Sequence, residues 1–221
     1  MTLVILSSEK TGAILIDMAS QFLDRTSLEL VTTAAALEQA SSNAGPKAVL
    51  LSHSSSVIVT SAILERFSGN AINIHSASPD FPGRDPHHFA IYHKATRYGA
   101  TLHKMEAKVD AGDILSVDLF DVLPEDTPET LLSKADQASL RLARAFLEGL
   151  SKTEMLPGSC GAHWGKCKTS RKDFIELCRL TPEMSAGEVS RRIQATSFRD
   201  YTNVWLDIWG RKFIPAAKDS D

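Results

Sequence analysis

The chain has 221 residues, of which 43% are hydrophobic and 23% are charged, and its formal net charge is −3. This length and composition predict one globular domain with room for a small addition, and the net charge provides no general attraction to nucleic acid. No apolar stretch approaches the roughly 18 residues of a membrane-spanning helix, so we expect no membrane partner.

The cysteines and the first ten residues bear on the cellular compartment. Cys160, Cys167 and Cys178 are odd in number and crowded together, which argues against a secreted disulfide framework. Residues 1–10 contain a short apolar run without a basic leader, which we interpret as a first strand and not as a signal peptide. We therefore expect a cytoplasmic protein.

Short apolar elements alternate with helical patterns at the start of the chain. The apolar elements are 3–6, 28–31, 48–51 and 71–74, and the helical patterns are 12–23, 33–40 and 62–67. This alternation predicts an α/β fold, a Rossmann-like open, twisted and mainly parallel sheet with helices on both faces. Ligands bind such sheets beyond the carboxyl ends of the strands.

The second half of the chain continues and then departs from this pattern. The predicted elements are a helix at 86–96, strands at 100–108 and 114–122 flanking a turn at 109–113, and a long helix from Thr127 to about 150. Residues 157–172 show no periodicity, a capping box at 185–188 opens a helix to 195, and 205–214 alternates like a hairpin around Gly210. We expect a main domain of residues 1–150 and a C-terminal appendage of residues 151–221.

Two polar residues stand at the carboxyl end of the 71–74 strand. Asn73 can donate a hydrogen bond to a carbonyl oxygen, and His75, two residues further on and so on the same side, can transfer a proton. Asp110, in the turn at 109–113, carries a carboxylate that can orient His75. Together they fit attack on a carbonyl without a nucleophilic side chain, although each residue also fits a strand cap or a tight turn.

Four ordered blocks give the chain a resemblance to a known family, the folate-dependent formyltransferases. The blocks are Asn73-Ile-His75, Ser78-Pro79-x-Phe81-x-Gly83-Arg84-x-Pro86-x-x-Phe89-Ala90, Tyr98-Gly99-Ala100-Thr101-Leu102-His103-x-Met105 and Val109-Asp110-Ala-Gly112-Asp113-Ile114-Leu115. The ordered match covers residues 73–115, and the order of strands and helices agrees more weakly from residue 1 to about 150. The resemblance implies that residues 1–150 form a formyltransferase catalytic domain.

The resemblance implies roles for individual residues toward 10-formyltetrahydrofolate, the formyl donor. Asn73 would hold the formyl oxygen, His75 would assist proton transfer from the attacking amine, and Asp110 would orient His75. The pterin pocket of the family maps onto two backbone segments, Val59, Thr60, Ser61, Ala62, Ile63 and Leu64, and Val109, Ala111, Gly112 and Asp113. The chain departs from the common pattern after His75, where Ser76-Ala77-Ser78-Pro79 leaves the loop shape open.

Each of the remaining candidate residues has either a functional role or a purely structural one. Arg84, His87, His88, Lys166 and Lys168 are candidate contacts to the amine acceptor, or else they pack, stabilise a loop or are solvated. The tail aromatics, Trp164 included, either stack on a planar ring or anchor the hairpin. We expect no metal, because no histidine pair has the helical spacing and acidic partner of a catalytic zinc site, and Cys160, His163 and Cys167 match no standard zinc module.

The resemblance leaves several amine acceptors open. Its methionyl-tRNA enzymes carry a further basic domain, and its glycinamide ribonucleotide enzymes end near the long helix, whereas its nucleotide-sugar N-formyltransferases have a short tail with a helix and a hairpin. We therefore expect formylation of a nucleotide-linked amino sugar, for example in the biosynthesis of surface polysaccharide such as the O-antigen of lipopolysaccharide. The alternatives are another small amine, such as hydroxyornithine, or a catalytically silent folate-binding protein. A homodimer is compatible with the sequence.

Overall fold

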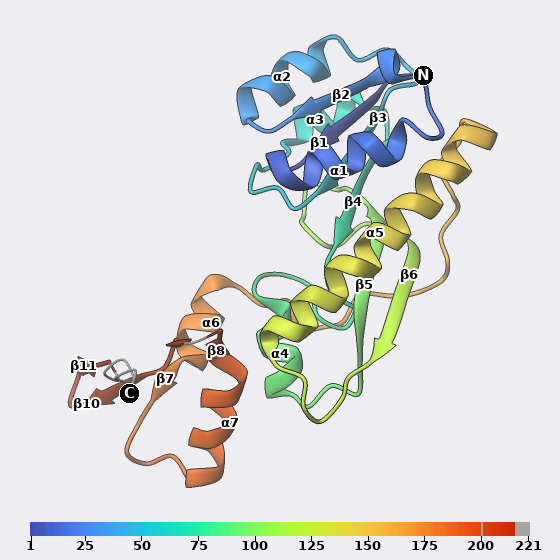
Figure 1. The fold of residues 1–221 in the computed structure, drawn as a ribbon. Helices are drawn as coiled ribbons and strands as arrows, with labels where there is room; N and C mark the ends of the chain where they lie inside the picture. Colours follow the sequence, from blue (N-terminus) through green and yellow to red (C-terminus); the bar gives the residue numbers. More distant parts are fainter. Residues whose placement is uncertain (200, 215–221) are drawn as a thin grey trace.

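A computed structural model describes residues 1–199 and 201–214 of the chain. Its central element is a six-stranded sheet with the strand order β2-β1-β3-β4-β5-β6 (Figure 1). The strands are β1 (Leu3–Leu6), β2 (Leu28–Val31), β3 (Val49–His53), β4 (Ala71–His75), β5 (Arg97–Lys104) and β6 (Ile114–Asp121). The first four strands pair in parallel, whereas β5 is antiparallel to both β4 and β6. The predicted α/β fold with a mainly parallel sheet is confirmed.

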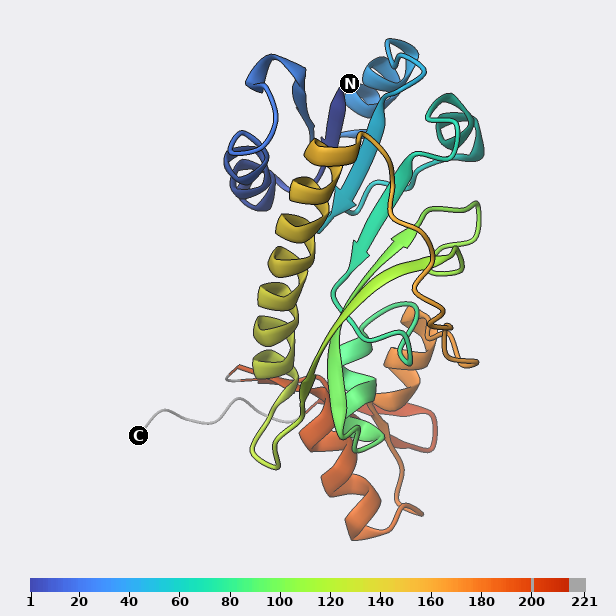
Figure 2. The ribbon, with the colours of Figure 1, turned by 90° about the vertical axis from the view of Figure 1, so that its right-hand side faces the viewer.

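Helices cover both faces of the sheet, as the sequence predicts. They are α1 (Glu9–Ala19), α2 (Ala34–Ser42), α3 (Ser61–Arg66), α4 (Pro86–Tyr92) and α5 (Pro128–Thr153), with a 3-10 turn at Arg25–Ser27. Alternate residues of β1 point to opposite faces, so Leu3 and Ile5 pack under α1 and α5 while Val4 and Leu6 pack under α2 and α3. Figure 2 shows α5 running along the length of the sheet on the face that it shares with α1.

The element boundaries differ from the predictions where capping decides them. Helix α1 begins at Glu9 and not at residue 12, because the side chain of Ser8 accepts a hydrogen bond from the amide of Thr11. Helix α5 begins at Pro128 as predicted, after the capping box formed by Thr127 and Thr130. None of the helices in the described part of the chain combines the length and apolar character that crossing a bilayer requires.

The tail forms its own small group of elements. They are α6 (Arg171–Leu177), β7 (Arg179–Leu180), α7 (Ala186–Thr196), β8 (Ser197–Phe198), β9 (Tyr201–Thr202), β10 (Trp205–Ile208) and β11 (Arg211–Phe213). The predicted helix and hairpin are present, and the hairpin turns at Trp209 and Gly210, which both have positive φ angles. The sequence missed α6, which is short and opens with a capping box of Ser170 and Asp173.

An ionic cluster fastens the tail to α4. The carboxylate of Glu188 in α7 accepts hydrogen bonds from the hydroxyl of Tyr92, at 2.8 Å, and from Nε of Arg192, at 2.7 Å. Burial opposes ionisation of Glu188, but the hydrogen bonds from Arg192 and Tyr92 outweigh it, and its pKa falls to about 2. Arg192 lies in α7 beside Glu188, so the bond that crosses to the main domain is the charge-assisted one from Tyr92. The division of the chain at residue 150 into two domains stays a prediction.

Two adjacent histidines of α4, His87 and His88, are packed at the contact between α4 and the tail. Nδ1 of His88 donates to the carbonyl oxygen of Ala195 at 2.6 Å, and its ring lies against Phe174. His87 lies against His88, with 4.3 Å between the ring centroids, and its buried Nδ1 has no hydrogen-bond partner. Burial, with a smaller contribution from His88, lowers the pKa of His87 to about 3. Both rings are therefore uncharged at neutral pH and serve as packing between α4 and the tail.

Acid is expected to weaken this junction. A histidine whose pKa falls on folding takes up a proton more readily in the unfolded chain. The free energy of unfolding is therefore at its full value above pH 6.5 and decreases as the pH falls from 6.5 toward 3. For His87 the loss is about 1.4 kcal/mol per pH unit in that window. His87→Leu should flatten the pH dependence of the free energy of unfolding between pH 6 and 4, as measured by urea titration. His93→Leu, at an exposed site, should leave the slope unchanged, and equal slopes for His87→Leu and the wild type would contradict this assignment.

Candidate active site

A cavity of about 550 Å³ opens at the carboxyl ends of β3 and β4. Asn73 and His75 reach it from β4 because they alternate with Ile72 and Ile74, which point into the core. The other lining residues come from β3 and the loop after it, from β4 and the residue that follows it, from the loop at 83–84, from the end of β5 with the turn that follows, and from the tail. They are Ser52, Ser54, Ser55, Ser56, Val57, Ile58, Val59, Ile74, Ser76, Gly83, Arg84, His103, Met105, Glu106, Ala107, Val109, Asp110, Lys168, Thr169, Ser170 and Arg171.

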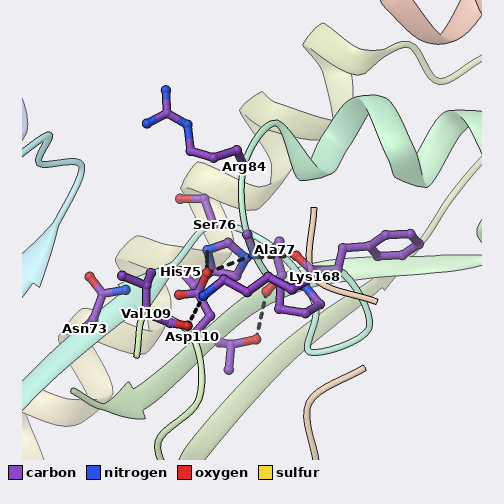
Figure 3. A network of polar contacts seen from close by, with 12 residues as sticks. Asn73, His75, Ser76, Ala77, Arg84, Val109, Asp110 and Lys168 are labelled. Carbon is purple, nitrogen blue, oxygen red and sulfur yellow. Dashed lines mark hydrogen bonds and ion pairs between the residues drawn. The ribbon is translucent and has the colours of Figure 1, made fainter. Parts of the chain in front are cut away.

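Asp110 supplies a buried carboxylate to this cavity. The residue has a φ of 47°, in the left-handed region that aspartate tolerates better than most residues, and only 7% of its surface is exposed. Oδ2 accepts a hydrogen bond from the amide of Gly83 at 2.9 Å, and it lies 3.9 Å from Nδ1 of His75. Oδ1 lies 3.6 Å from Nε2 of His103. The carboxylate is thus placed between two imidazoles, as Figure 3 shows for His75.

His103 fixes the orientation of the Asn73 amide. Burial lowers the pKa of His103 to about 4, so its ring is neutral at neutral pH. Its Nδ1 donates to the carbonyl oxygen of Lys104 at 2.7 Å, which leaves Nε2 as an acceptor. The Asn73 amide nitrogen lies 3.0 Å from that Nε2 and donates to it. One amide hydrogen of Asn73 is thereby occupied, and the second remains available to an oxygen in the cavity.

The tautomer of His75 follows from its own hydrogen bond. Nε2 of His75 lies 3.0 Å from the carbonyl oxygen of Phe81, an acceptor, so Nε2 carries the hydrogen. In the neutral ring Nδ1 then has a free lone pair, 3.9 Å from Oδ2 of Asp110. Proton uptake at Nδ1 would create an imidazolium beside the carboxylate. This arrangement suits a proton acceptor whose charged form is stabilised in place.

The tail closes one side of the site. Thr169 pairs with Gly83 through two backbone hydrogen bonds to the residues on either side of Gly83. The amide of Arg84 donates to the carbonyl oxygen of Thr169 at 2.9 Å, and the amide of Thr169 donates to the carbonyl oxygen of Pro82 at 3.0 Å. Nζ of Lys168 donates to the carbonyl oxygen of Val109, and Figure 3 shows this side chain reaching the Asp110 turn. A segment more than fifty residues away in sequence therefore completes the cavity wall.

The structure brings together some of the residues predicted from the sequence. Asn73, His75 and Asp110 share the cavity with Val59, Val109, Arg84 and Lys168. The Arg84 side chain extends away from His75 and Asp110 (Figure 3). A contact of Arg84 with a reacting group is therefore not part of this arrangement, and a contact with a more distant part of the acceptor stays a prediction.

Other predicted residues lie outside the cavity lining. They are Thr60, Ser61, Ala62, Ile63, Leu64, Ala111, Gly112, Asp113, His87, His88 and Lys166. In the first segment Thr60 caps α3 and Ile63 is buried in the core, so the preceding loop at 54–59 lines the cavity instead. His87 and His88 face the tail helices and not the cavity, and His88 is only 5% exposed. The prediction that these two histidines contact the acceptor is not supported.

Sequence reasoning assigned no role to His103 and Gly83, and for Trp164 it offered only stacking on a planar ring or anchoring of the hairpin. His103 is a polar side chain that follows the buried stretch Tyr98–Leu102 of the same strand, and that contrast is the signal that could have singled it out. Gly83 and Trp164 gave no usable signal, because their contacts depend on how the tail returns to the loop at 79–84. Within the described ranges 1–199 and 201–214, no three His, Cys, Asp or Glu side chains are grouped as metal ligands.

Comparison with known proteins gives the family. The family model described as formyl transferase matches residues 17–144. The methionyl-tRNA formyltransferase of Geobacillus sp. (strain WCH70) is 33% identical over 171 residues, which is 74% of this chain and 53% of that protein. The chain belongs to the formyl transferase family, and its alignment spans about half the length of that relative.

Solved structures share the whole fold at low sequence identity. A sugar N-formyltransferase from Shewanella sp. aligns over 100% of both chains with a TM-score of 0.72 and 19% identity. The N-formyltransferase from Helicobacter canadensis, solved in complex with folinic acid and dTDP-3-aminofucose, aligns over 96% of this chain and 86% of its own, with a TM-score of 0.74 and 16% identity. The likeness therefore includes the tail as well as the sheet.

Replacing Gly83 should damage both the fold and the site. Gly83 has a φ of 103°, and a Cβ at this position would lie 2.1 Å from the carbonyl oxygen of Thr169. Gly83→Ala is expected to lower the free energy of unfolding by roughly 1–3 kcal/mol from backbone strain alone, as measured by urea titration. Gly158→Ala is the matched control, because nothing lies within 4 Å of its Cβ position. Equal stability of the two variants would contradict the tight contact between the loop and the tail.

Proposed function

We propose that the protein transfers the formyl group of 10-formyltetrahydrofolate to a primary amine. The observation that carries this proposal is the convergence of a free Asn73 amide hydrogen, the Nδ1 lone pair of His75 and the Asp110 carboxylate in one cavity. These groups provide an oxyanion donor, a proton acceptor and a counter-charge for that acceptor. Membership of the formyl transferase family supports the same reaction.

The reaction follows from these positions. The amine nitrogen attacks the formyl carbon, the new C–N bond forms, and the carbonyl oxygen gains negative charge that Asn73 stabilises by its second amide hydrogen. The proton released by the amine passes to Nδ1 of His75, and Asp110 stabilises the imidazolium. When the bond from the formyl carbon to N10 of the folate breaks, His75 returns the proton to N10. The products are the formamide and tetrahydrofolate.

The acceptor in this proposal is an amino sugar linked to a nucleotide. The fold likeness to sugar N-formyltransferases extends over nearly the whole of both chains, and one of them was solved with a dTDP-linked amino sugar. Arg84, Lys168 and Arg171 line the cavity and can contact its phosphates. The free cysteines Cys160, Cys167 and Cys178 are compatible with a reducing cytoplasm.

The 33% identity to methionyl-tRNA formyltransferase favours a second acceptor. Purified protein supplied with 10-formyltetrahydrofolate and a panel of amines, with tetrahydrofolate release as the readout, separates the candidates. Turnover with nucleotide-linked amino sugars is the expected result. Turnover only with methionyl-tRNA would overturn the sugar assignment and retain formyl transfer, whereas folate binding without turnover of any amine would indicate a silent binding protein.

Removing the reacting groups should lower kcat. Asn73→Ala removes the oxyanion donor and is expected to lower kcat by about 10²–10³-fold. His75→Ala and Asp110→Asn remove the proton acceptor and its counter-charge, and losses of about 10²–10⁴-fold are expected for the proton-transfer step. Steady-state kinetics measures these losses. Ser56→Ala, at a cavity residue without an assigned role, should retain kcat within about threefold, and wild-type kcat in His75→Ala would contradict the mechanism.

The phosphate contact can be tested separately from the chemistry. Arg84→Ala is expected to raise KM for the nucleotide-linked acceptor by about tenfold, since one charge-assisted hydrogen bond to phosphate is worth about 1.4 kcal/mol. KM for 10-formyltetrahydrofolate should not change. Lys172→Ala is the control, because this exposed lysine does not line the cavity. An unchanged acceptor KM in Arg84→Ala would remove Arg84 from the phosphate site.

A further inference from the structure

The proposed reaction uses no residue between 151 and 167, yet one side chain of this segment, Trp164, packs against the rings of His75 and His103. The indole ring of Trp164 meets the ring of His103 edge-on, with 4.9 Å between centroids and an interplanar angle of 87°. It meets the ring of His75 at 5.9 Å and 63°. Edge-to-face contacts of this kind restrict the rotation of both imidazoles.

The polar end of Trp164 is also engaged. Its Nε1–H donates to the carbonyl oxygen of Gly112 at 2.8 Å, in the turn that carries Asp110. Gly112 is itself close to β5, since a Cβ there would lie 2.2 Å from the carbonyl oxygen of Lys104. One side chain therefore contacts the ring of His75, the ring of His103 and the turn of Asp110.

The backbone around Trp164 is built to hold the ring in this place. The amide of Gly165 donates to the carbonyl oxygen of Pro79 at 2.9 Å, in the loop that follows His75. A Cβ at residue 165 would lie 2.5 Å from the carbonyl oxygen of Asp80, so glycine allows this close approach. On the other side, the amide of Cys160 donates to the carbonyl oxygen of Ile114 at 2.9 Å.

Among residues 1–199 and 201–214, neither of the other two tryptophans contacts the ring of His75 or of His103. Trp209 lies in the turn of the hairpin and is 97% exposed. Trp205 lies in β10, where the ammonium group of Lys212 stands 5.1 Å from its ring centroid. Trp164 thus differs from both, because it connects the tail directly to the two imidazoles.

We propose that Trp164 is a positioning residue for formyl transfer: it holds the His75 ring and the Asp110 turn in the arrangement in which His75 accepts the proton of the amine beside the Asp110 carboxylate, so that the tail is part of the catalytic apparatus. This inference rests on the proposed function. Trp164 contacts no reacting atom in this assignment and acts through His75 and the turn. A displacement of reacting groups by about 1 Å can cost on the order of 10²-fold in rate.

Kinetics of two substitutions test the proposal. Trp164→Ala is expected to lower kcat by about 10–100-fold with KM for 10-formyltetrahydrofolate unchanged within about threefold, because orientation and not binding is lost. Trp164→Phe retains the aromatic edge without the indole N–H, and should recover part of that loss. Trp209→Ala is the control and should behave as the wild type. A purely structural tryptophan would change the yield of folded protein and leave kcat of the folded fraction as it was, which would overturn the proposal.

A double-mutant cycle shows whether Trp164 acts through His75. On the His75→Ala background, Trp164→Ala should lower the residual rate by less than about twofold, since the group that it positions is already gone. A further loss as large as that in the wild-type background would mean that Trp164 acts independently of His75, and the proposal would be wrong.

A measurement without turnover separates this proposal from the proposed function. Long-range proton–nitrogen NMR spectra of 15N-histidine-labelled protein report which ring nitrogen carries the hydrogen. The wild type should show His75 with the hydrogen on Nε2, and Trp164→Ala or, if that variant does not fold, Trp164→Phe should show a mixture of tautomers or a shifted Nδ1 signal. Unchanged His75 signals in the folded variant would overturn the positioning role, whether or not the wild type transfers formyl groups. Absence of wild-type turnover with a changed His75 spectrum would overturn the proposed function alone.

Discussion

The antiparallel pairing of β5 with β4 is the constraint on which the site depends. It sets His103 directly across from Asn73 and Thr101 across from His75. Because direct cross-strand neighbours lie within reach of one hydrogen bond, the neutral imidazole of His103 can hold the Asn73 amide in a single orientation. A parallel strand in this place would run in the opposite direction, so the turn that follows it and carries Asp110 would leave from the other end of the sheet.

Burial makes these polar contacts specific. His103 and Asp110 are 2% and 7% exposed, so each must find partners within the protein. The carboxylate obtains an amide hydrogen from Gly83 and the proximity of two imidazoles, and the imidazole of His103 obtains the Lys104 carbonyl and the Asn73 amide. Each hydrogen bond fixes the orientation of the neighbouring side chain, so the amide of Asn73 faces the cavity in a single orientation. That restriction is what a pre-oriented carbonyl site requires.

The tail contributes to the site at one end and is anchored at the other. Trp164 contacts the turn of Asp110 and Thr169 contacts the loop at Gly83, while the hydrogen bond from Tyr92 to Glu188 joins α4 to α7. His88 of α4 also contacts the ring of Phe174 in α6 and the carbonyl oxygen of Ala195 in α7. The tail is therefore joined to the main domain at the cavity and again at α4.

Much of the fold and part of the site could be predicted from local sequence, because strand alternation, helix caps and the ordered blocks from Asn73 to Leu115 are short-range signals. The sequence by itself determined the α/β sheet, its strand ends and the candidate trio Asn73, His75 and Asp110. Only the tertiary structure decided that His103 orients Asn73, that the loop at 54–59 and not α3 lines the cavity, and that Trp164 packs on the imidazoles. These facts depend on strand register and on chain segments more than fifty residues apart, and side-chain burial there is set by packing that no local pattern encodes.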